Sequence, residues 1–410
     1  MSGLKRILLI LLLLVVAAGI GIVIYFVFFL KVPPGQIIPT LFRTTTPSVL
    51  PPSGQAVPPT GVTTTPTQPT LPSAGVIPQP PSPSYAQPLP VTQLTSASAA
   101  FTSLNQASAA VRYHNTADGK FYRIGTDGTP QALTDQVFYN VSNVTWAKTQ
   151  DKAVLEYPDG SKVVYDFNLK KQTTTLPKHW SEFSFSPEGT QIAAKSIGLS
   201  PENRWLITTN DDGTGTKTIE PMGNNADQVI VDWSPNRQVL AFSQTGEPQG
   251  GYRREVLFVG QNHENFKSTI VEGFGFQPSW SPTGNKLLYS VYSANSDFKP
   301  ELWIVKSSGD QIGSGRQALQ INTWADKCTF ANDDVVYCAV PREMPQGAGI
   351  SPAIVSNSYY DLYRIDTKTG LKQGVALGGD YRIKDMTFDQ KNNKLFFTDA
   401  AQSGVFEVNI

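Results

Sequence analysis

The chain has 410 residues, which is enough for a sizeable hydrophobic core and more than one structural segment. Lysine plus arginine and aspartate plus glutamate each number 33, so the formal net charge is zero, and this balance excludes the basic footprint of a nucleic-acid-binding protein. Charged residues make up only 16% of the chain, below the roughly 25% usual in globular proteins.

The first predicted element is a membrane anchor at Ile7 to Leu30. This run carries no charge, and as a helix rising about 1.5 Å per residue it exceeds the ~30 Å hydrocarbon core of a bilayer. Because Lys5 and Arg6 precede it, the positive-inside bias favours a cytoplasmic N-terminus. We expect residues 1–6 to form a cytoplasmic tail, residues 7–30 to form a retained transmembrane signal anchor in the cell membrane, and the rest to be extracytoplasmic. Cleavage after the small residues at 17–19 is the alternative.

A linker is predicted between the anchor and the folded part, at residues 31–90. From Pro33 to Pro90, 17 of the 58 residues are proline, threonine is abundant, and Arg43 is the only charged residue. Such a composition buries too little apolar surface to fold, so we expect a disordered, semi-extended stalk. Its threonine and proline content also suits O-glycosylation, with a bare spacer as the alternative interpretation.

The chain from Val91 to Ile410 repeats one pattern: an aromatic residue, a polar turn and an apolar run. In "SWSPTGNKLLYS" a strand ends at Trp280, Pro282 lacks the N–H that would extend its ladder, and Gly284 permits a tight turn. We interpret the repeated aromatic residues as packing between neighbouring units; they are Phe101, Trp146, Phe185, Trp233, Trp280, Phe330 and Phe388. A third strand follows each apolar run, and a shorter fourth strand follows in all units but the last.

Four strands in about 46 residues predict the blades of a β-propeller. We expect an all-β fold of seven blades, with six as the alternative because the first unit is weakly patterned. The last unit stops at Ile410 after its third strand, whereas a spare strand, Val91 to Thr95, precedes the first unit. The spare strand should therefore pair with the C-terminal strand and close the ring, which removes open sheet edges. The predicted propeller spans residues 91–410.

The segments "SFSPEGTQIAAKS", "DWSPNRQVLAFSQ" and "SWSPTGNKLLYS" resemble the WD-like repeats of the TolB family and of related propellers, including those of prolyl-oligopeptidase-type peptidases. The resemblance covers the chain from about Val91 to its end. It implies a propeller fold and an extracytoplasmic setting with protein or glycan partners. It does not extend to TolB itself, because the anchor and the linker stand where that family has a cleaved signal and an α/β domain.

No motif in the sequence assigns a catalytic role. There is no G-x-S-x-G nucleophile elbow, and the three histidines fall in different units without H-x-H or H-E-x-x-H spacing. The acidic stretches "GTDGT" from Gly125 and "NDDGTG" from Asn210 stand where hairpin turns are expected. We therefore predict no catalytic residue, no metal site and no cofactor. The rival hypothesis is a propeller enzyme, a lyase or glycosidase acting in the central funnel.

Four neighbouring units, the third to the sixth, have long connections between their second and third strands, and these connections must emerge on one face of the ring. Arginine and tyrosine are favoured at interface hot spots. The predicted partner-binding residues are Arg204, Tyr252, Arg253, Arg254, Phe298 and Arg342. We expect an envelope or surface protein, or a glycan, as the partner, and a binding or scaffolding role. Unselected loop growth is the alternative interpretation of these connections, and a purely structural envelope component is the third functional hypothesis.

The two cysteines, Cys328 and Cys338, flank the turn "ANDD". If this turn centres near Asp333, the two residues lie opposite each other on antiparallel strands, with Cα atoms about 4.5–5.5 Å apart. That separation is within reach of a disulfide, and an extracytoplasmic location favours one. A register shift of one residue would make them diagonal and leave two small buried apolar side chains.

Overall fold

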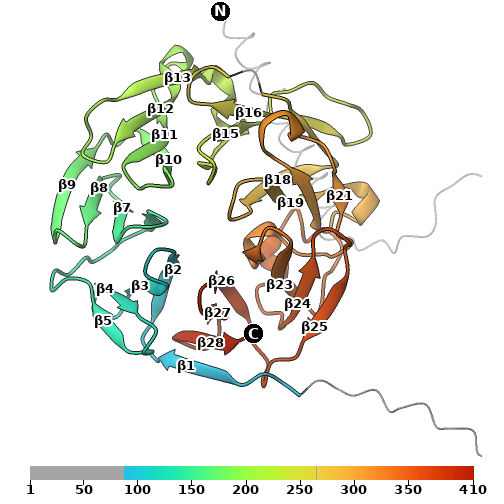
Figure 1. Cartoon of the computed structure of the whole chain (residues 1–410). Helices are drawn as coiled ribbons and strands as arrows, with labels where there is room; N and C mark the ends of the chain where they lie inside the picture. Colours follow the sequence, from blue (N-terminus) through green and yellow to red (C-terminus); the bar gives the residue numbers. More distant parts are fainter. Residues whose placement is uncertain (1–86, 265) are drawn as a thin grey trace, which may run out of the picture. The chain divides into compact units, whose positions relative to one another are not determined.

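The computed structural model describes residues 87–264 and 266–410, and these form a ring of seven four-stranded antiparallel sheets (Figure 1). The predicted seven-bladed β-propeller is confirmed, and the six-bladed alternative is wrong. The predicted tail (1–6), the predicted anchor (7–30) and residues 31–86 of the predicted linker lie outside the described residues. Within the described ranges, no helix is long and apolar enough to cross a membrane.

The first four blades follow one another along the chain, each from an inner to an outer strand (Figure 1). Blade 1 contains β2 (Ala99–Asn105), β3 (Ala110–Asn115), β4 (Lys120–Ile124) and β5 (Pro130–Ala132). Blade 2 contains β6 (Asn143–Trp146), β7 (Lys152–Glu156), β8 (Lys162–Asp166) and β9 (Lys171–Leu176). Blade 3 contains β10 (Trp180–Phe185), β11 (Gln191–Ile197), β12 (Arg204–Asn210) and β13 (Lys217–Pro221). Blade 4 contains β14 (Val229–Val231), β15 (Val239–Ser243), β16 (Arg254–Gly260) and β17 (Thr269–Val271).

The remaining blades continue this order until the chain ends inside blade 7. Blade 5 contains β18 (Phe274–Trp280), β19 (Lys286–Tyr292), β20 (Glu301–Lys306) and β21 (Gln317–Ala318). Blade 6 contains β22 (Cys328–Asn332), β23 (Val335–Pro341), β24 (Tyr360–Asp366) and β25 (Lys372–Val375). Blade 7 contains β26 (Ile383–Asp389), β27 (Lys394–Asp399) and β28 (Val405–Asn409), and its outer strand is β1 (Val91–Thr95).

The closing strand pairs as the sequence predicts. β1 runs antiparallel to β28, with Val91 opposite Val408 and Thr95 opposite Val405. Just before it, the Leu89 N–H donates to the carbonyl of Ala376 at 2.8 Å, so the chain already contacts the link between blades 6 and 7. Both ends of the described ring therefore meet in one sheet, and β28 is paired on both sides instead of being an open edge.

The hydrophobic core lies between the blades. Seven clusters of buried apolar residues each draw members from two neighbouring blades, the seventh joining blade 7 to blade 1. The predicted interblade packing is confirmed for six of the seven repeated aromatics: Trp146, Phe185, Trp233, Trp280, Phe330 and Phe388. It is wrong for Phe101, which is half-buried and outside these clusters. Phe101 lies at the register shift between β2 and β3, with a left-handed φ of 53°. The repeated position is held three residues later by Leu104, which pairs with Val111 as Phe185 pairs with Ile192 and packs against the cluster between blades 7 and 1.

Arg112 connects blades 1 and 2 through polar contacts. Its fully buried guanidinium donates to the carbonyls of Gln150 (2.6 Å) and Ala147 (3.0 Å) of blade 2 and lies 3.5 Å from a carboxylate oxygen of Asp151. It also lies 4.5 Å from the centre of the Trp146 ring. Burial lowers the pKa of Arg112 to about 10, against the opposing effect of Asp151. One side chain thus satisfies several buried acceptors of the neighbouring blade.

Aspartate side chains shape the acidic hairpin turns. Asp127 accepts the N–H of Thr129 at 3.2 Å, and Asp212 accepts the N–H of Thr214 at 2.9 Å. The acidic stretches that begin at 125 and 210 therefore serve as turns, as the sequence suggests.

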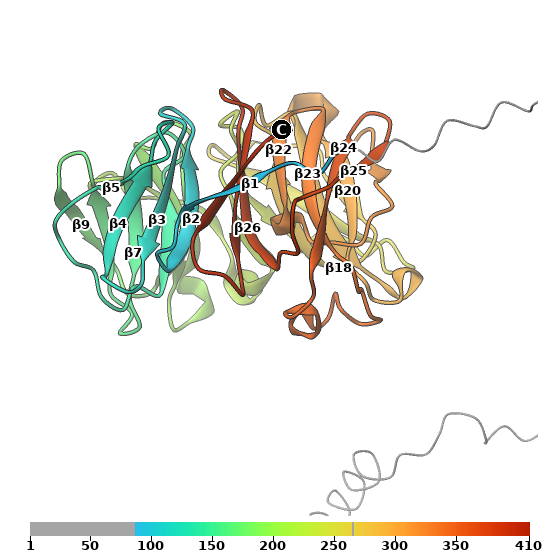
Figure 2. The same cartoon turned by 90° about the horizontal axis from the view of Figure 1, so that it is seen from below.

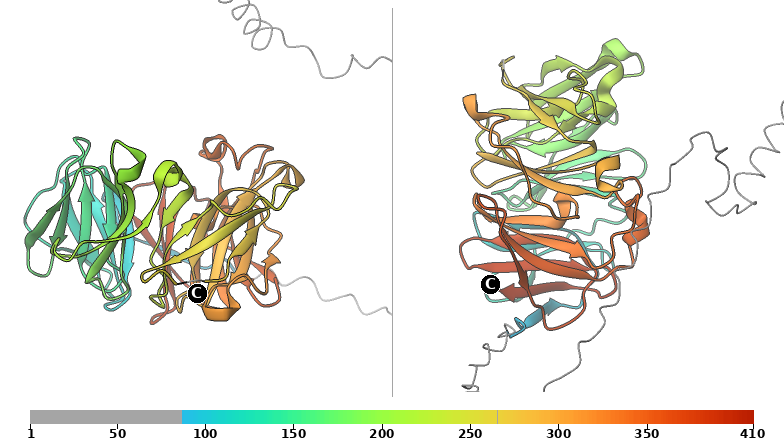
Figure 3. Two further views of the ribbon diagram at one scale, coloured as in Figure 1. Left: turned by 90° about the horizontal axis from the view of Figure 1, so that it is seen from above. Right: turned by 90° about the vertical axis from the view of Figure 1, so that its right-hand side faces the viewer.

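The ring has two unlike faces. Turns between first and second strands, and between third and fourth strands, lie at the face where the chain ends; we call it the short-turn face. At the opposite face the second-to-third connections of blades 3 to 6 span residues 198–203, 244–253, 293–300 and 342–359, and the loops of the orange blades project there (Figure 2; Figure 3, left). We call this the long-loop face. It carries the 3₁₀ helices η1 (Pro201–Asn203), η3 (Ala294–Ser296) and η6 (Pro352–Val355), and the links between blades that meet it hold η2 (Gly223–Gln228) and η5 (Ala325–Lys327). The helix η4 (Gly309–Gln311) belongs to the short-turn face.

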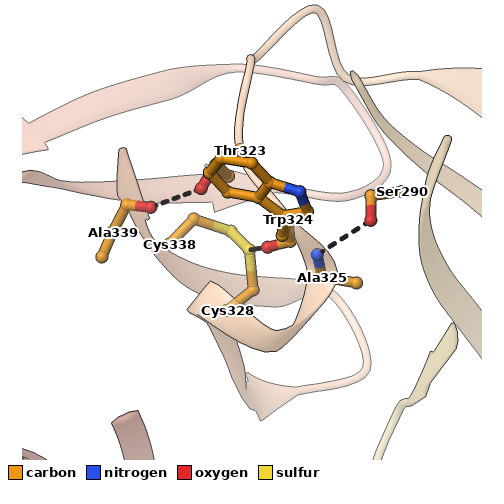
Figure 4. Close-up of a disulfide and its surroundings, with 7 residues drawn as sticks. All are labelled: Ser290, Thr323, Trp324, Ala325, Cys328, Cys338 and Ala339. Atoms are coloured by element: carbon orange, nitrogen blue, oxygen red, sulfur yellow. Dashed lines mark hydrogen bonds between the residues drawn. A yellow bond between two sulfur atoms is a disulfide. The ribbon is translucent and has the colours of Figure 1, made fainter. Parts of the chain in front are cut away.

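Cys328 and Cys338 are directly opposite each other on β22 and β23, with Cα atoms 4.1 Å apart, and their sulfur atoms are joined as a disulfide (Figure 4). The carbonyl oxygen of Trp324 lies 3.6 Å from Cys328 Sγ. Beside it, Thr323 donates to the carbonyl of Ala339 at 2.6 Å (Figure 4). The disulfide thus sits against the link that contains η5.

Candidate functional site

The long-loop face carries most of the exposed large apolar side chains of the described ring. Eight of them stand on its connections, on its links between blades or at adjoining strand ends: Val137, Tyr139, Leu199, Tyr252, Phe274, Ile350, Ile354 and Tyr359. The three that lie elsewhere are Leu169, Leu257 and Leu371. Exposed apolar side chains gathered on one face are typical of interaction surfaces.

Tyr252 and Arg254, two of the predicted partner-binding residues, meet in an aromatic cluster. The ring of Tyr252 lies edge-on to Phe274, with centroids 5.9 Å apart, and the Arg254 guanidinium lies 5.5 Å from the centre of the Phe274 ring. Phe274 in turn lies beside Tyr292, at 6.4 Å between centroids. Blades 4 and 5 thus share a surface of aromatic rings with a stacked cation, which suits apolar and aromatic groups of a ligand.

Phe274 and Tyr292 are absent from the residues predicted to bind. The signal for them lies in "GFGF", residues 273–276. A Cβ at Gly275, whose φ is 65°, would lie 2.4 Å from the Tyr292 ring. The glycine therefore lets the two aromatic segments approach closely.

Arg204 and Arg253 are engaged by their own surroundings. Arg204 donates to three main-chain carbonyls of its connection and of the following link, at 3.2–3.4 Å. Arg253 donates to the carbonyl of Gln249 at 3.2 Å, and its side chain is exposed. Arg204 therefore helps to shape its connection, whereas Arg253 is accessible to a ligand.

Phe298 marks the contact between the connections of blades 5 and 6. Its carbonyl accepts the N–H of Gly349 at 2.8 Å, and the carbonyl of Asp297 accepts the N–H of Gly347 at 3.0 Å. A Cβ at Gly349 would lie 2.5 Å from the Cβ of Tyr292, so glycine is needed at this approach. The 342–359 connection thus rests on blade 5, and the side chain of Phe298 is half-buried.

Arg342 belongs to a charged cluster around Tyr359. It pairs with Asp361 through Nε at 2.8 Å and with Asp380 through Nη1 at 2.7 Å. Hydrogen bonds to these two carboxylates raise the pKa of the Arg342 guanidinium. The guanidinium of Arg382, a residue that sequence reasoning missed, lies 5.2 Å from the centre of the Tyr359 ring, and that of Arg342 lies 5.9 Å from it. Two guanidinium groups therefore lie against the Tyr359 ring, and the charge of one of them, that of Arg342, is neutralised by two aspartates.

A central channel opens on the short-turn face. A cavity of about 610 Å³ there is lined by inner strands and turns and includes Asp232 and Lys148. Burial raises the pKa of the Asp232 carboxyl to about 6, against the opposing effect of Lys148. Lys148 donates to the carbonyl of Trp233 at 3.4 Å. Across the part of the chain that the structure describes, no three His, Cys, Asp or Glu residues are grouped so as to hold a metal ion.

These features define the chain as a seven-bladed β-propeller, and other propellers have similar structures. The β-propeller domain of Cps50 (Swd1) from Myceliophteria thermophila has a TM-score of 0.54 and 10% identity, with coverage of 78% of this chain and 98% of that one. An oligogalacturonate lyase from Vibrio parahaemolyticus has a TM-score of 0.48 and 11% identity, covering 78% and 93%. TolB from Acinetobacter baumannii has a TM-score of 0.41 and 15% identity, covering 70% and 65%.

No family model matches the sequence, and no curated protein matches it. Identities this low show the fold alone. The resemblance of the repeats to WD-like sequences is thus confirmed for the propeller fold, and membership of the TolB family is not shown.

Proposed function

We propose that this chain is a membrane-anchored, extracytoplasmic propeller of the cell envelope that binds or scaffolds a protein or a glycan through its long-loop face. The observation that carries the proposal is that eight of the eleven exposed large apolar side chains of the described ring stand on this face, five of them on the enlarged connections. None of the seven interblade clusters includes a residue of these connections. The enlarged connections are therefore not part of the packing between blades, and the longest of them, residues 342–359, exceeds the ~12–15 residues above which loops are usually functional or disordered.

The chemistry of the face supports either kind of partner. The rings of Tyr252 and Phe274 offer flat apolar surface, and the stacked guanidinium of Arg254 adds a planar cation. Exposed Arg253 can offer paired donors to a carboxylate. Such groups bind aromatic and aliphatic side chains, and they also stack on sugar rings.

A retained anchor supports the envelope location. Residues 7–30 are uncharged and long enough to span a bilayer, and Lys5 and Arg6 precede them. N-terminal sequencing of the protein recovered from membranes should begin at the native N-terminus. A mature chain that begins after Ala18 would contradict the anchor.

Partner capture tests the binding role. The full chain, purified in mild detergent and immobilised, should retain a specific envelope component. A variant without residues 346–357 loses the main-chain contacts to blade 5 and should retain much less of it. Equal capture by the parent, by this variant and by a variant with Tyr252, Arg253 and Arg254 replaced by alanine would rule out the long-loop face as the binding surface.

The second candidate function is that of an enzyme, a lyase or glycosidase acting in the central channel. Asp232 favours it, because a carboxyl that titrates near pH 6 can exchange protons close to neutrality. The channel cavity lies on the short-turn face, so such an activity would depend on Asp232 and not on the long connections. Degradation of an envelope polysaccharide that is lost in Asp232→Asn and kept in the 346–357 deletion would identify this function in place of binding.

A further inference from the structure

A pocket of about 400 Å³ lies beside η6, where the 342–359 connection meets the inner strands of blades 5 and 7. Its walls are largely apolar and include Trp324, Val355, Tyr360 and Ile383. Three of these side chains are buried, and Trp324 is half-buried. A concave apolar site of this size has room for a bulky apolar side chain together with a neighbouring polar group.

The rim of the pocket is cationic. Lys327, Arg382 and Lys384 line it, against one carboxylate, Asp326. None of these three cations forms an ion pair with a residue in the described ranges, and Lys327 donates instead to the carbonyl of Lys384 at 2.5 Å. Excess positive charge beside an apolar hollow is complementary to an anion that carries an apolar group.

The two arginines that share the ring of Tyr359 differ in their partners. Arg342 is neutralised by Asp361 and Asp380. Arg382 has only a 3.4 Å contact from Nη1 to the side-chain oxygen of Asn357, and its buried Nε has no partner among the described atoms. Stacking on Tyr359 holds the plane of the Arg382 guanidinium, so a ligand carboxylate meets a donor group that is already oriented.

We propose that this pocket binds a polypeptide partner at a carboxylate that stands next to a bulky apolar side chain. The apolar side chain occupies the hollow lined by Trp324 and Tyr360, and the carboxylate pairs with an Nη group of Arg382. The proposal rests on the proposed binding function and specifies its partner chemistry. The walls favour a peptide over a glycan, because sugar hydroxyls would lose hydrogen bonds to water against Val355 and Ile383. The carboxylate can belong to an Asp or Glu side chain or to a chain terminus.

Random peptides of about 12 residues displayed on phage are the probe, because an extended peptide of that length spans more than one side-chain site. One library has a free C-terminus, and in the other the C-terminus is fused to the coat protein. Both are selected on the full chain in mild detergent. We expect enrichment of an acidic group next to Leu, Ile, Phe or Met. Enrichment in the first library alone would show that the pocket binds the C-terminal carboxylate of the peptide. Enrichment in both libraries would show that it binds an acidic side chain.

A selected peptide with a fluorescent label then tests the site by anisotropy. Arg382→Gln removes the guanidinium and should weaken binding about tenfold or more. Ala400→Phe fills the pocket wall without removing a charge and should have a similar effect. Lys217→Gln removes a charge from the exposed outer strand of blade 3 and should bind like the parent. Melting temperatures of all variants within ~3 °C of the parent establish that the fold is intact.

Selected peptides without an acidic group next to an apolar residue would overturn the proposal, as would equal affinity of the parent, Arg382→Gln and Ala400→Phe. Binding of a labelled oligouronate that Arg382→Gln abolishes, with no peptide selected, would assign the pocket to an acidic glycan and overturn the peptide. The peptide tests can contradict the pocket while replacement of Tyr252, Arg253 and Arg254 by alanine still abolishes capture of the native partner. In that case the long-loop face binds the partner, and the pocket is not its binding site. If no variant or deletion of the long-loop face affects native capture, the proposed function itself is wrong.

Discussion

The guanidinium of Arg112 lies 4.5 Å from the centre of the Trp146 ring, so a cation of the first blade is buried on an aromatic side chain of the second. The same guanidinium reaches Asp151 and two main-chain carbonyls of blade 2. The predicted interblade role of Trp146 therefore includes a polar component that the repeat pattern does not reveal.

Arg112→Leu should lower the free energy of unfolding by about 3–5 kcal/mol, because it removes one partner of a buried ion pair and leaves buried carbonyls unsatisfied. Urea denaturation measures this. Arg123→Leu is a matched control, since Arg123 lies 3.7 Å from the same Asp151 but is 44% exposed. It should cost less than about 1 kcal/mol. An equal decrease in the free energy of unfolding of the two variants would show that burial does not determine how much each arginine contributes to stability.

The closing strand is expected to be essential for the ring. A chain that begins at Ser96 lacks β1 and leaves β28 as an open edge, so it should melt at least ~5 °C lower than a chain that begins at Ser84, and it should aggregate. Differential scanning calorimetry and sedimentation compare the two. Equal melting temperatures and equal solubility would mean that the pairing of β1 with β28 contributes nothing.

The disulfide should stabilise blade 6. Because it joins cysteines ten positions apart, replacing Cys328 and Cys338 by alanine should cost about 2–3 kcal/mol through the greater freedom of the unfolded chain. Intact mass after alkylation without reductant should show no modified thiol. Two alkylated thiols would show that the cysteines are reduced in the native protein.

The partner-binding surface can be tested with little risk to the fold. Replacement of Tyr252, Arg253 and Arg254 by alanine should weaken partner capture by ~2 kcal/mol or more, with little change in melting temperature because the site is at the surface. Replacement of Leu169, Lys170 and Lys171 by alanine removes one exposed apolar residue and two cations from the short-turn face, and it should leave capture unchanged. Equal capture by both variants would contradict the assignment.

Asp232 predicts a pH dependence of stability. Its carboxyl has a pKa near 3.8 when unfolded and about 6 in the channel, so between these values the folded protein binds more protons than the unfolded chain. The free energy of unfolding should therefore fall as pH rises through this window, by at most about 3 kcal/mol, and stay level above it. Asp232→Asn should lack this component and be the more stable protein at pH 7. Denaturation curves from pH 4 to 8 that run parallel for the two proteins would contradict a raised pKa.

The architecture could be predicted because its main signals are local in the sequence. An aromatic strand end, a turn and an apolar return strand recur within a few residues of one another, as around Trp280. The spare strand at Val91–Thr95 has only one place to pair once the last unit lacks a fourth strand. Phe101 departs from the pattern because it lies at a register shift three residues before the repeated position, which Leu104 occupies, and composition does not reveal where a strand shifts its register.

The candidate site was less predictable, because its contacts join different blades. Phe274 contacts Tyr252 across the gap between blades 4 and 5, and Arg382 reaches Tyr359 from blade 7. Residue type suggested that Arg342 offers free donors, but two carboxylates from other segments occupy them. Loop length and composition indicate which face has the long connections. Only the packing of the blades shows which arginines on that face are already paired with carboxylates and which can still bind an anionic ligand.

The place where the chain enters the ring has a mechanical consequence. Val91 is the first residue of an outer strand, and the five-residue β1 is the piece of blade 7 that is not continuous with the rest of that blade. Any tension applied at Gln87 therefore loads the hydrogen bond from Leu89 to Ala376 and then the short ladder between β1 and β28 before it reaches the other sheets. Pulling on the chain from that side would first open the ring at blade 7, whereas tension applied through a partner on the 342–359 connection would enter through blade 6 and its disulfide.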